Sequence, residues 1–304
     1  MNVSQRINQV SAALETAGVH FGHGTDNALD EAAWLVLHVI SAPLDGSFDD
    51  WGKELTAAED ARITRLLKKR ITQKVPLAYL TGSARFAGLE FAVSEAALVP
   101  RSPLAEVILE QFRPWLKPQL VQRVLDLCTG SACIAVAIAH HMPWTQIDAA
   151  DISPAALEVA AVNVERYGLE QRVRLIESDL FHSIPACRYD LIVANPPYVP
   201  SESIAALPGE YRAEPRLGLA SGSDGLDAAL AILALAPDYL GADGVLVCEV
   251  GESEKRLQTL LPRLPFVWLQ FASGGSGVFV LTRNELESAR QTVATLLEGR
   301  THVV

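Results

Sequence analysis

Apolar and polar residues alternate with the period of an α-helix over residues 3–18, 27–40 and 57–73. The third segment has its own start, because Thr56 and Glu59 have the spacing of a capping box, in which the two side chains satisfy backbone N–H groups of the first turn. Pro76 then prevents any continuation, since proline lacks the N–H that a helix interior needs. The pattern predicts a small helical domain over residues 1–73.

The helical period is lost over residues 84–100, where strand-forming residues follow one another at short range. Phe86, Leu89 and Phe91 flank Ala87 and Gly88, which is the pattern of a β-hairpin. We therefore expect residues 74–100 to form a hairpin linker, and a second domain, residues 101–304, to begin at Arg101.

Beyond Arg101, short apolar runs alternate with helical stretches. The runs "RVLDL", "QIDAAD", "VRLIES" and "YDLIVA" are separated by the helical patterns of residues 133–142 and 154–168. Such alternation predicts an α/β domain with a parallel sheet covered by helices. The end of the chain differs, because "FVWLQF" and "GVFVLT" are separated only by "ASGGS", and a connection this short requires an antiparallel pair.

Composition narrows the class of protein. The 25 basic and 36 acidic residues give a formal charge of -11, which argues against a protein that depends on nucleic-acid phosphates and favours a basic protein partner. The four cysteines have no paired spacing, so we expect buried thiols, with no disulfide framework and no metal site. The chain has no run of about 20 apolar residues and its start lacks the apolar centre of a signal peptide, which favours the cytoplasm.

Three successive predicted strands end at or near an acid. Asp126 closes the first and precedes the turn of residues 129–132, Asp151 closes the second, and Asp179 follows the third. In open parallel sheets ligands bind beyond these carboxyl ends, so the acids predict a nucleoside site, with Asp151 placed to accept from a ribose diol. The alternative is a set of acids that merely cap neighbouring helices. A dinucleotide is less favoured, because the turn holds one glycine, Gly130; S-adenosylmethionine, which has no phosphate, fits better.

The fourth predicted strand runs directly into Asn195, Pro196, Pro197 and Tyr198. Prolines lack N–H donors and restrict the backbone, so the carbonyl oxygens here have fixed directions and no ladder partner. Together with the Asn195 amide and the Tyr198 ring, they suit a planar amino group. The alternative, a simple strand terminator, does not require asparagine before the prolines and tyrosine after them.

These motifs resemble those of the protein glutamine methyltransferases, a branch of the S-adenosylmethionine-dependent class I methyltransferases. The resemblance covers the whole chain, including "DLCTGSACIA", "NPPY" and "EPRLGLASGSDGL". It implies a Rossmann-like, mostly parallel seven-stranded sheet with an antiparallel terminal hairpin, a helical N-terminal domain for substrate recognition, and conversion of S-adenosylmethionine to S-adenosylhomocysteine without a metal. The resemblance implies cofactor contacts at Asp126, Cys128, Thr129, Gly130, Asp151, Ile152, Asp179, Leu180 and Asn195, and substrate contacts at Asn195, Pro196, Pro197, Tyr198, Arg101 and Glu214. It places Asn195, Pro196 and Tyr198 at the reacting amide.

Two segments point to one branch of that family. The chain has "VPRSPLAEVIL" where the release-factor branch carries Arg-Pro-Asp-Thr-Glu, and "GEYRAEP" is similar to the branch that methylates ribosomal large-subunit protein three. The resemblance therefore implies a glutamine of that protein, free or in an assembly intermediate, as the substrate, and a role in ribosome assembly. Three alternatives stay open: a release-factor glutamine methyltransferase, a DNA adenine methyltransferase, and a ribosome assembly factor without enzymatic activity.

Three further features bear on this interpretation. Ala132 stands where the family usually has glycine, and a methyl group there is free of strain only at negative φ, which would alter cofactor affinity. The basic run Lys68–Arg70 is expected to be a solvated helix face, with contact to ribosomal RNA as the alternative. Trp34 is expected in the core.

Overall fold

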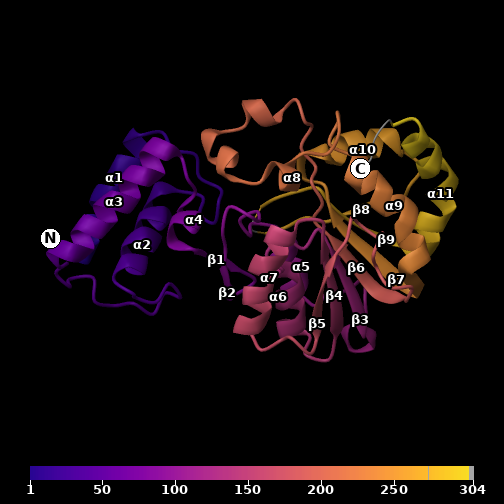
Figure 1. Cartoon of the computed structure of the whole chain (residues 1–304), viewed down its shortest axis with the longest axis horizontal. Helices are drawn as coiled ribbons and strands as arrows, with labels where there is room; N and C mark the ends of the chain where they lie inside the picture. The colour runs from indigo at the N-terminus through magenta and orange to yellow at the C-terminus, as the bar shows by residue number, and fades with distance from the viewer. Residues whose placement is uncertain (273, 301–304) are drawn as a thin grey trace.

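The computed structural model describes residues 1–272 and 274–300. Residue 273, in the connection expected between the last two strands, and residues 301–304, at the end of the expected second domain, lie outside the described residues. In Figure 1 the N-terminal helices stand beside a larger α/β body, and the first strand pair lies where the two meet. No helix in the described part of the chain is both long and apolar enough to cross a membrane.

The N-terminal part is helical, as predicted. It contains α1 (Val3–Thr16), α2 (Ala28–Val39) and α3 (Ala57–Gln73). The short α4 (Leu77–Thr81) was not predicted: it lies in the stretch expected to be linker, and its Leu77 belongs to the N-terminal core. Thr56 and Glu59 form the expected capping box at the start of α3. Val10, Leu35 and Ile63, one from each long helix, are fully buried in a shared apolar core. This part of the chain therefore has a core of its own.

The expected hairpin is also present. Strands β1 (Ser83–Phe86) and β2 (Leu89–Ala92) pair antiparallel, and Ala87 and Gly88 make the turn with positive φ. Asn163 anchors the hairpin to the α/β body: its Oδ1 accepts from Ala92 N at 2.7 Å, and its Nδ2 donates to the carbonyls of Ala92 and Ser131. The linker is thus attached to the turn that follows the first strand of the large sheet.

The large sheet has seven strands in the order β5-β4-β3-β6-β7-β9-β8. The first five in that order are parallel, whereas β9 runs antiparallel to β7 and β8, as the short connection predicted. The strands are β3 (Arg123–Leu127), β4 (Gln146–Asp151), β5 (Val173–Glu177), β6 (Tyr189–Ala194), β7 (Leu240–Glu249), β8 (Val267–Trp268) and β9 (Val278–Thr282). Strand order reverses at β3, which has β4 on one side and β6 on the other.

Helices cover both faces of this sheet. One face packs against α5 (Leu104–Leu109), α6 (Cys133–His141) and α7 (Pro154–Arg166), and the other against α9 (Asp227–Tyr239), α10 (Glu254–Leu260) and α11 (Arg283–Glu298). Along β6, Leu191 and Val193 belong to the first apolar core and Ile192 and Ala194 to the second. Burial on both faces explains why the strands read as continuous apolar runs. The short helix α8 (Arg216–Leu219) and the 3₁₀ turns η1 (Pro118–Leu120), η2 (Ile204–Ala206), η3 (Gly209–Ala213) and η4 (Gly251–Ser253) complete the elements.

A buried group of charges joins the N-terminal helices to the segment that follows "NPPY". The Arg70 guanidinium, 1% exposed, donates to Glu31 at 2.6 Å and to Glu210 of η3 at 2.9 Å. His20 N also donates to Glu210, at 3.0 Å. Lys68 and Lys69 are solvated as expected, but the expectation was wrong for Arg70, which faces inward one residue further along the helix.

Replacing Arg70 tests this junction. Arg70→Met leaves Glu31 buried without its cation and Glu210 with only Lys74, 3.9 Å away; removal of one partner of a buried ion pair costs about 3–5 kcal/mol. We expect urea denaturation to show a loss of this size, whereas Lys69→Met, the same change on an exposed neighbour, should unfold at the wild-type urea concentration. Equal midpoints for the two variants would contradict the role assigned to Arg70.

Candidate active site

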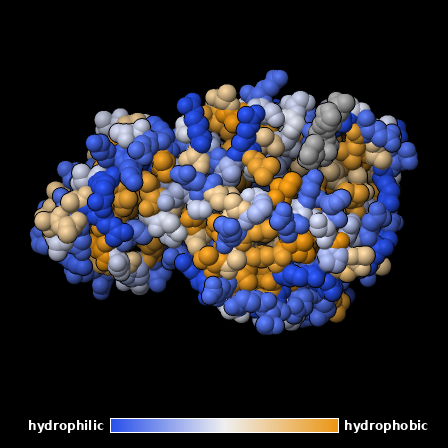
Figure 2. Space-filling model, viewed as in Figure 1, coloured by the Kyte–Doolittle hydropathy of each residue, from blue (hydrophilic) through white to orange (hydrophobic). Residues whose placement is uncertain are grey.

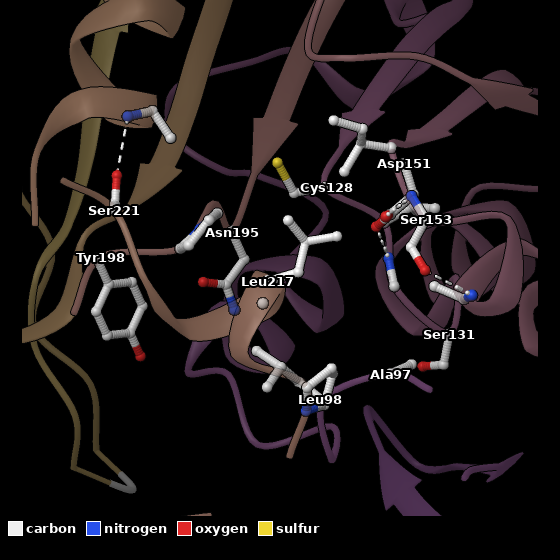
Figure 3. A pocket seen from close by; sticks show the side chains of 18 of the residues that line it. Ala97, Leu98, Cys128, Ser131, Asp151, Ser153, Asn195, Tyr198, Leu217 and Ser221 are labelled. Carbon is white, nitrogen blue, oxygen red and sulfur yellow. Dashed lines mark hydrogen bonds between the residues drawn. The ribbon is translucent and has the colours of Figure 1, made fainter. Parts of the chain in front are cut away.

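A cavity of about 300 Å³ opens at the carboxyl ends of β3, β4 and β6, where the strand order reverses. Side chains that follow different strands meet there because parallel strands end at the same edge of the sheet. In Figure 3, Asn195 lies between Tyr198 on one side and Cys128 and Asp151 on the other. The segments 96–102 and 215–222 supply the remaining walls.

Asp151 organises the turn after β3. Its Oδ2 accepts from the backbone N–H of Gly130 at 2.8 Å, and its Oδ1 accepts from Ser153 N at 2.9 Å. Burial raises the pKa of this carboxyl, although the two N–H donors act in the opposite direction. Gly130 has φ 54°, a conformation that favours glycine. Each carboxylate oxygen has a further lone pair, so Asp151 can also accept from a hydroxyl group in the cavity.

Several residues on this side of the cavity have left-handed backbones. Cys128 has φ 58°, Leu180 φ 44° and Ala132 φ 59°. Such conformations cost about 1–3 kcal/mol each for residues other than glycine and concentrate at functional sites. Ala132 therefore occupies the strained conformation that its methyl group disfavours, and its effect on cofactor affinity stays a prediction.

Asp126 lies beneath the same turn. It is fully buried, and its Oδ2 accepts from Thr129 Oγ1 at 2.5 Å and from Ala135 N at 3.1 Å. Its Oδ1 is buried without a hydrogen-bond partner among the described residues. Burial raises the pKa of Asp126 to about 7. Asp126 thus holds the turn from behind, and one of its oxygens remains able to accept.

Asn195 and Pro196 present unused acceptors. Asn195 lines the cavity, and within residues 1–272 and 274–300 neither its side chain nor the Pro196 carbonyl oxygen takes part in a hydrogen bond. Pro196 itself is buried directly behind. The Asn195 side chain at the cavity wall is therefore suited to a ligand that donates hydrogen bonds, and Pro196 adds a carbonyl without a partner directly behind that wall.

Tyr198 is held rigidly by close backbone contacts. A Cβ atom added to Gly225 would lie 2.2 Å from the Tyr198 carbonyl oxygen, and one added to Gly251 would lie 2.6 Å from the Tyr198 ring. Ser253 Oγ also donates to the Tyr198 carbonyl at 2.9 Å. Only glycine fits at both positions, so the ring has a fixed place at the cavity wall.

Glu249, at the end of β7, is a site residue that the sequence interpretation missed. It lines the cavity, although it is only 4% exposed; Ser102 Oγ donates to its Oε2, and Tyr198 Oη lies 3.4 Å from its Oε1. Burial raises its pKa, against the effects of the Ser102 hydroxyl and the Arg101 charge. An acid closing an apolar strand, the pattern that identified Asp151, is also present in "GVLVCEV" and could have revealed it.

Arg101 and Glu214 form a bidentate ion pair at the cavity rim. Arg101 Nη2 donates to Glu214 Oε2 at 2.7 Å, Nη1 donates to Oε1, and Val99 N donates to Oε1 at 3.2 Å. The guanidinium lies 5.2 Å from the centre of the Tyr211 ring. His23, from the N-terminal part, approaches Glu214 at 3.6 Å and packs on Tyr211. The rim is therefore built from both parts of the chain.

Most of the site residues expected from the sequence meet at this cavity. Those that line it are Cys128, Thr129, Gly130, Asp151, Ile152, Asp179, Leu180, Asn195, Pro197, Tyr198 and Arg101. Asp126, Pro196 and Glu214 lie behind the lining. Among the described residues, no three His, Cys, Asp or Glu side chains are grouped to hold a metal ion, and all four cysteines are free thiols.

Comparisons with known proteins cover both parts of the chain. Residues 5–82 match the family described as PrmC N-terminal domain, and residues 105–206 match the Methyltransferase small domain. The ribosomal protein uL3 glutamine methyltransferase of Neisseria meningitidis is 48% identical over 271 residues, 89% of each chain. The protein of the same name from Xanthomonas campestris is 48% identical over 290 residues, 95% of this chain and 94% of the relative.

Solved structures agree with this fold. The hMettl16 catalytic domain in complex with a MAT2A 3'UTR hairpin is similar with a TM-score of 0.50, at 14% identity, over 75% of this chain and 82% of that one. At this level of identity the likeness concerns the fold alone. It is consistent with the mostly parallel sheet and its antiparallel end.

The Arg101–Glu214 pair predicts a pH-dependent stability. Burial alone would raise the pKa of Glu214, but the neighbouring His23 and Arg101 hold it at about 2, below the ordinary 4.5. A depressed pKa stabilises the fold above pH 4.5, and this contribution is lost as the pH falls toward 2. Glu214→Gln should therefore be less stable than wild type by on the order of 3 kcal/mol near pH 7, with the difference shrinking steadily below pH 4.5.

The measurement is urea denaturation of both proteins across this pH range. Asp243→Asn neutralises an acid that is exposed on the α/β body; it is the matched control, and its stability should follow that of the wild type at every pH. If the difference in free energy of unfolding between wild type and Glu214→Gln stayed constant from pH 7 down to pH 2, the ion pair could not be its source.

Proposed function

The chain belongs to the ribosomal protein uL3 glutamine methyltransferases, and from this premise we propose that it transfers a methyl group from S-adenosylmethionine to the side-chain amide nitrogen of a glutamine in uL3. The observation that carries the proposal is the Asn195 side chain without a partner at the wall of a cavity that Asp151 also lines, with the unpartnered Pro196 carbonyl directly behind it. A glutamine amide has two N–H donors to match them.

The residues of the cavity fit the cofactor. Asp151 would accept from the ribose hydroxyls, and Asp179 and Leu180 after β5 would border the adenine. Asp126, with its partnerless Oδ1, is fully buried behind the turn that is expected to meet the amino-acid end, and it would hold this turn in place. When bound, S-adenosylmethionine supplies an electrophilic methyl group. No metal is needed for that transfer.

Asn195 and Pro196 would prepare the nucleophile. An amide nitrogen is a poor nucleophile because its lone pair is delocalised into the carbonyl group. If Asn195 Oδ1 and the Pro196 carbonyl accept its two N–H bonds, they fix the nitrogen and direct its lone pair toward the cofactor side of the cavity. The rigid Tyr198 ring closes the other side and stabilises positive charge on the nitrogen.

Glu249 is suited to the proton that must leave. Formation of the N–CH₃ bond leaves the amide nitrogen cationic until one of its two protons departs. Glu249 lines the cavity beside Tyr198, and burial raises its pKa, which favours proton uptake from so strong an acid. The neutral carboxyl can then return the proton to solvent.

The same family membership suggests a role for each part of the chain. Residues 1–73 would recognise the substrate protein, residues 74–100 connect, and residues 101–304 carry out the transfer. The substrate would be met in the cytoplasm, either as free uL3 or in a ribosomal assembly intermediate, with any contact to ribosomal RNA secondary.

A parallel transfer assay separates this function from its rivals. Labelled S-adenosylmethionine is offered with purified uL3, a release factor or duplex DNA, and Asn195→Ala serves as the inactive control. We expect label on uL3 alone. Label on the release factor would support glutamine methylation but assign the chain to the release-factor branch. Label on DNA alone would contradict a protein substrate. No label on any of the three would favour a ribosome assembly factor without enzymatic activity.

Asn195→Ala should separate chemistry from cofactor binding. The variant loses amide alignment, and the loss of one oriented polar group at a reacting centre costs on the order of 100- to 1000-fold in kcat. Calorimetry should show nearly unchanged affinity for S-adenosylmethionine. A comparable loss of affinity would place Asn195 in the cofactor site and remove it from the amide.

Asp151→Ala should have the opposite effect. Without the buried carboxylate, the ribose hydroxyls lose their acceptor, and we expect affinity for S-adenosylmethionine to fall by about 10- to 100-fold. Turnover at saturating cofactor should recover most of its wild-type value. Unchanged affinity in calorimetry would exclude Asp151 from the ribose contact.

A further inference from the structure

A second cavity of about 300 Å³ lies in the N-terminal part of the chain, apart from the site at the sheet edge. Its walls include Trp34, Phe48 and Trp51, and the Phe48 and Trp51 rings meet edge to face at 4.9 Å between centroids. Trp51 is 44% exposed. Trp34, which was expected to be a core residue, is half-buried: it packs against the N-terminal core and also borders this cavity, and its indole nitrogen has no acceptor in the described structure. Aromatic side chains around a hollow, one of them exposed to solvent, are typical of a binding surface.

Acidic residues frame the second cavity. Asp30 lines it, and Asp26, Asp45, Asp49 and Asp50 are exposed on the two loops that supply its other walls. Arg85 is the single cation among the lining residues, and its Nη1 already donates to the Leu44 carbonyl. The cations Arg85 and Lys53, the latter exposed on the same loop as Asp49 and Asp50, offset only two of these five aspartates, so the charge around the cavity is negative and favours a cation.

Aromatic rings and carboxylates together select one kind of side chain. The faces of tryptophan rings attract ammonium and guanidinium groups. Lysine and arginine also carry apolar stems that can pack against Leu37 and Leu44, while the charged head reaches Asp30 at the rim. An anionic ligand such as an RNA phosphate would be repelled by the same aspartates.

One short loop connects the second cavity to the rim of the first, which Arg101 and Glu214 form. Gly24 and Thr25 line the second cavity. Immediately before them, His23 approaches Glu214 at 3.6 Å, and Glu214 holds Arg101 at the first cavity. The same loop therefore borders the second cavity and contributes to the rim of the first.

From these observations we propose that the second cavity binds a lysine or arginine side chain from a basic segment of the substrate protein. The inference rests on the proposed function, because uL3 is taken as the substrate. A protein that binds ribosomal RNA must carry lysine and arginine to neutralise phosphates, so it can supply such a segment. The cavity then anchors the substrate at a point separate from the glutamine that is methylated.

Steady-state kinetics with purified uL3 test the proposal. Trp51→Ala and Asp30→Asn should each raise the KM for uL3 by about 3- to 10-fold and leave kcat within about twofold of wild type, because they remove binding that is equal in the ground state and the transition state. Trp51→Phe, which retains an aromatic face, should have a smaller effect. The KM for S-adenosylmethionine should not change.

Two variants serve as matched controls. Trp144→Ala removes another partly exposed tryptophan, 38% exposed, and Asp243→Asn neutralises another exposed aspartate, both on the α/β body. Neither should alter the KM for uL3. Circular dichroism of every variant checks the fold, and if Trp51→Ala does not fold, Asp30→Asn and Trp51→Phe still give the result.

The outcomes distinguish the proposal from its premise. A wild-type protein that transfers no methyl group to uL3 would refute the proposed function. A wild-type protein that methylates uL3, with cavity variants whose KM equals that of the controls, would refute the docking site alone. Tighter binding of Asp30→Asn to ribosomal RNA, with an unchanged KM for uL3, would show that the aspartate repels RNA without binding the protein and would also overturn the proposal.

Discussion

The rest of the structure depends on the requirement that buried charges be paired. Arg70 is almost completely enclosed, and its partners Glu31 and Glu210 come from the N-terminal helices and from the segment after "NPPY". An unpaired charge in such a place costs several kcal/mol, so the two parts of the chain must dock in one arrangement. Four residues beyond Glu210, Glu214 fixes Arg101 at the cavity rim. Charge pairing thus determines where the Arg101 side of the first cavity lies.

The topology of the sheet supplies the other half of the site. Reversal of strand order at β3 brings the ends of β3, β4 and β6 together, and with them Gly130, Asp151 and Asn195. Left-handed backbones at Cys128 and Leu180 lie at the same edge. Strained backbones of this kind concentrate at functional sites, and the Asn195 side chain at this edge has no hydrogen-bond partner among the described residues. A rigid site of this kind suits a reaction in which alignment of a poor nucleophile is the main requirement.

Much of the fold was predictable from the sequence, because it depends on local patterns. These are the helical periods, the Thr56 capping box, the hairpin at Ala87 and Gly88, and the antiparallel end of the sheet. The acids at the strand ends and "NPPY" are also local patterns, and they predicted where the cavity lies. The sequence could not predict which way a side chain points when its partner lies far away along the chain. The run Lys68–Arg70 contains two solvated residues and one buried residue, and the burial of Arg70 depends on Glu210, 140 residues away. Likewise, nothing local to Glu214 indicates that it lies behind Arg101.

The second cavity offers the substrate a contact away from the reacting amide. The loop that borders this cavity also reaches the rim of the first cavity. The central claim is nevertheless chemical: the methyl group goes to a glutamine side-chain amide. The most direct test is peptide mapping by mass spectrometry of uL3 after reaction with isotopically labelled S-adenosylmethionine. The account predicts one labelled methyl group on the side-chain nitrogen of a single glutamine. Label on lysine, on the terminal amine or on a carboxylate would contradict it.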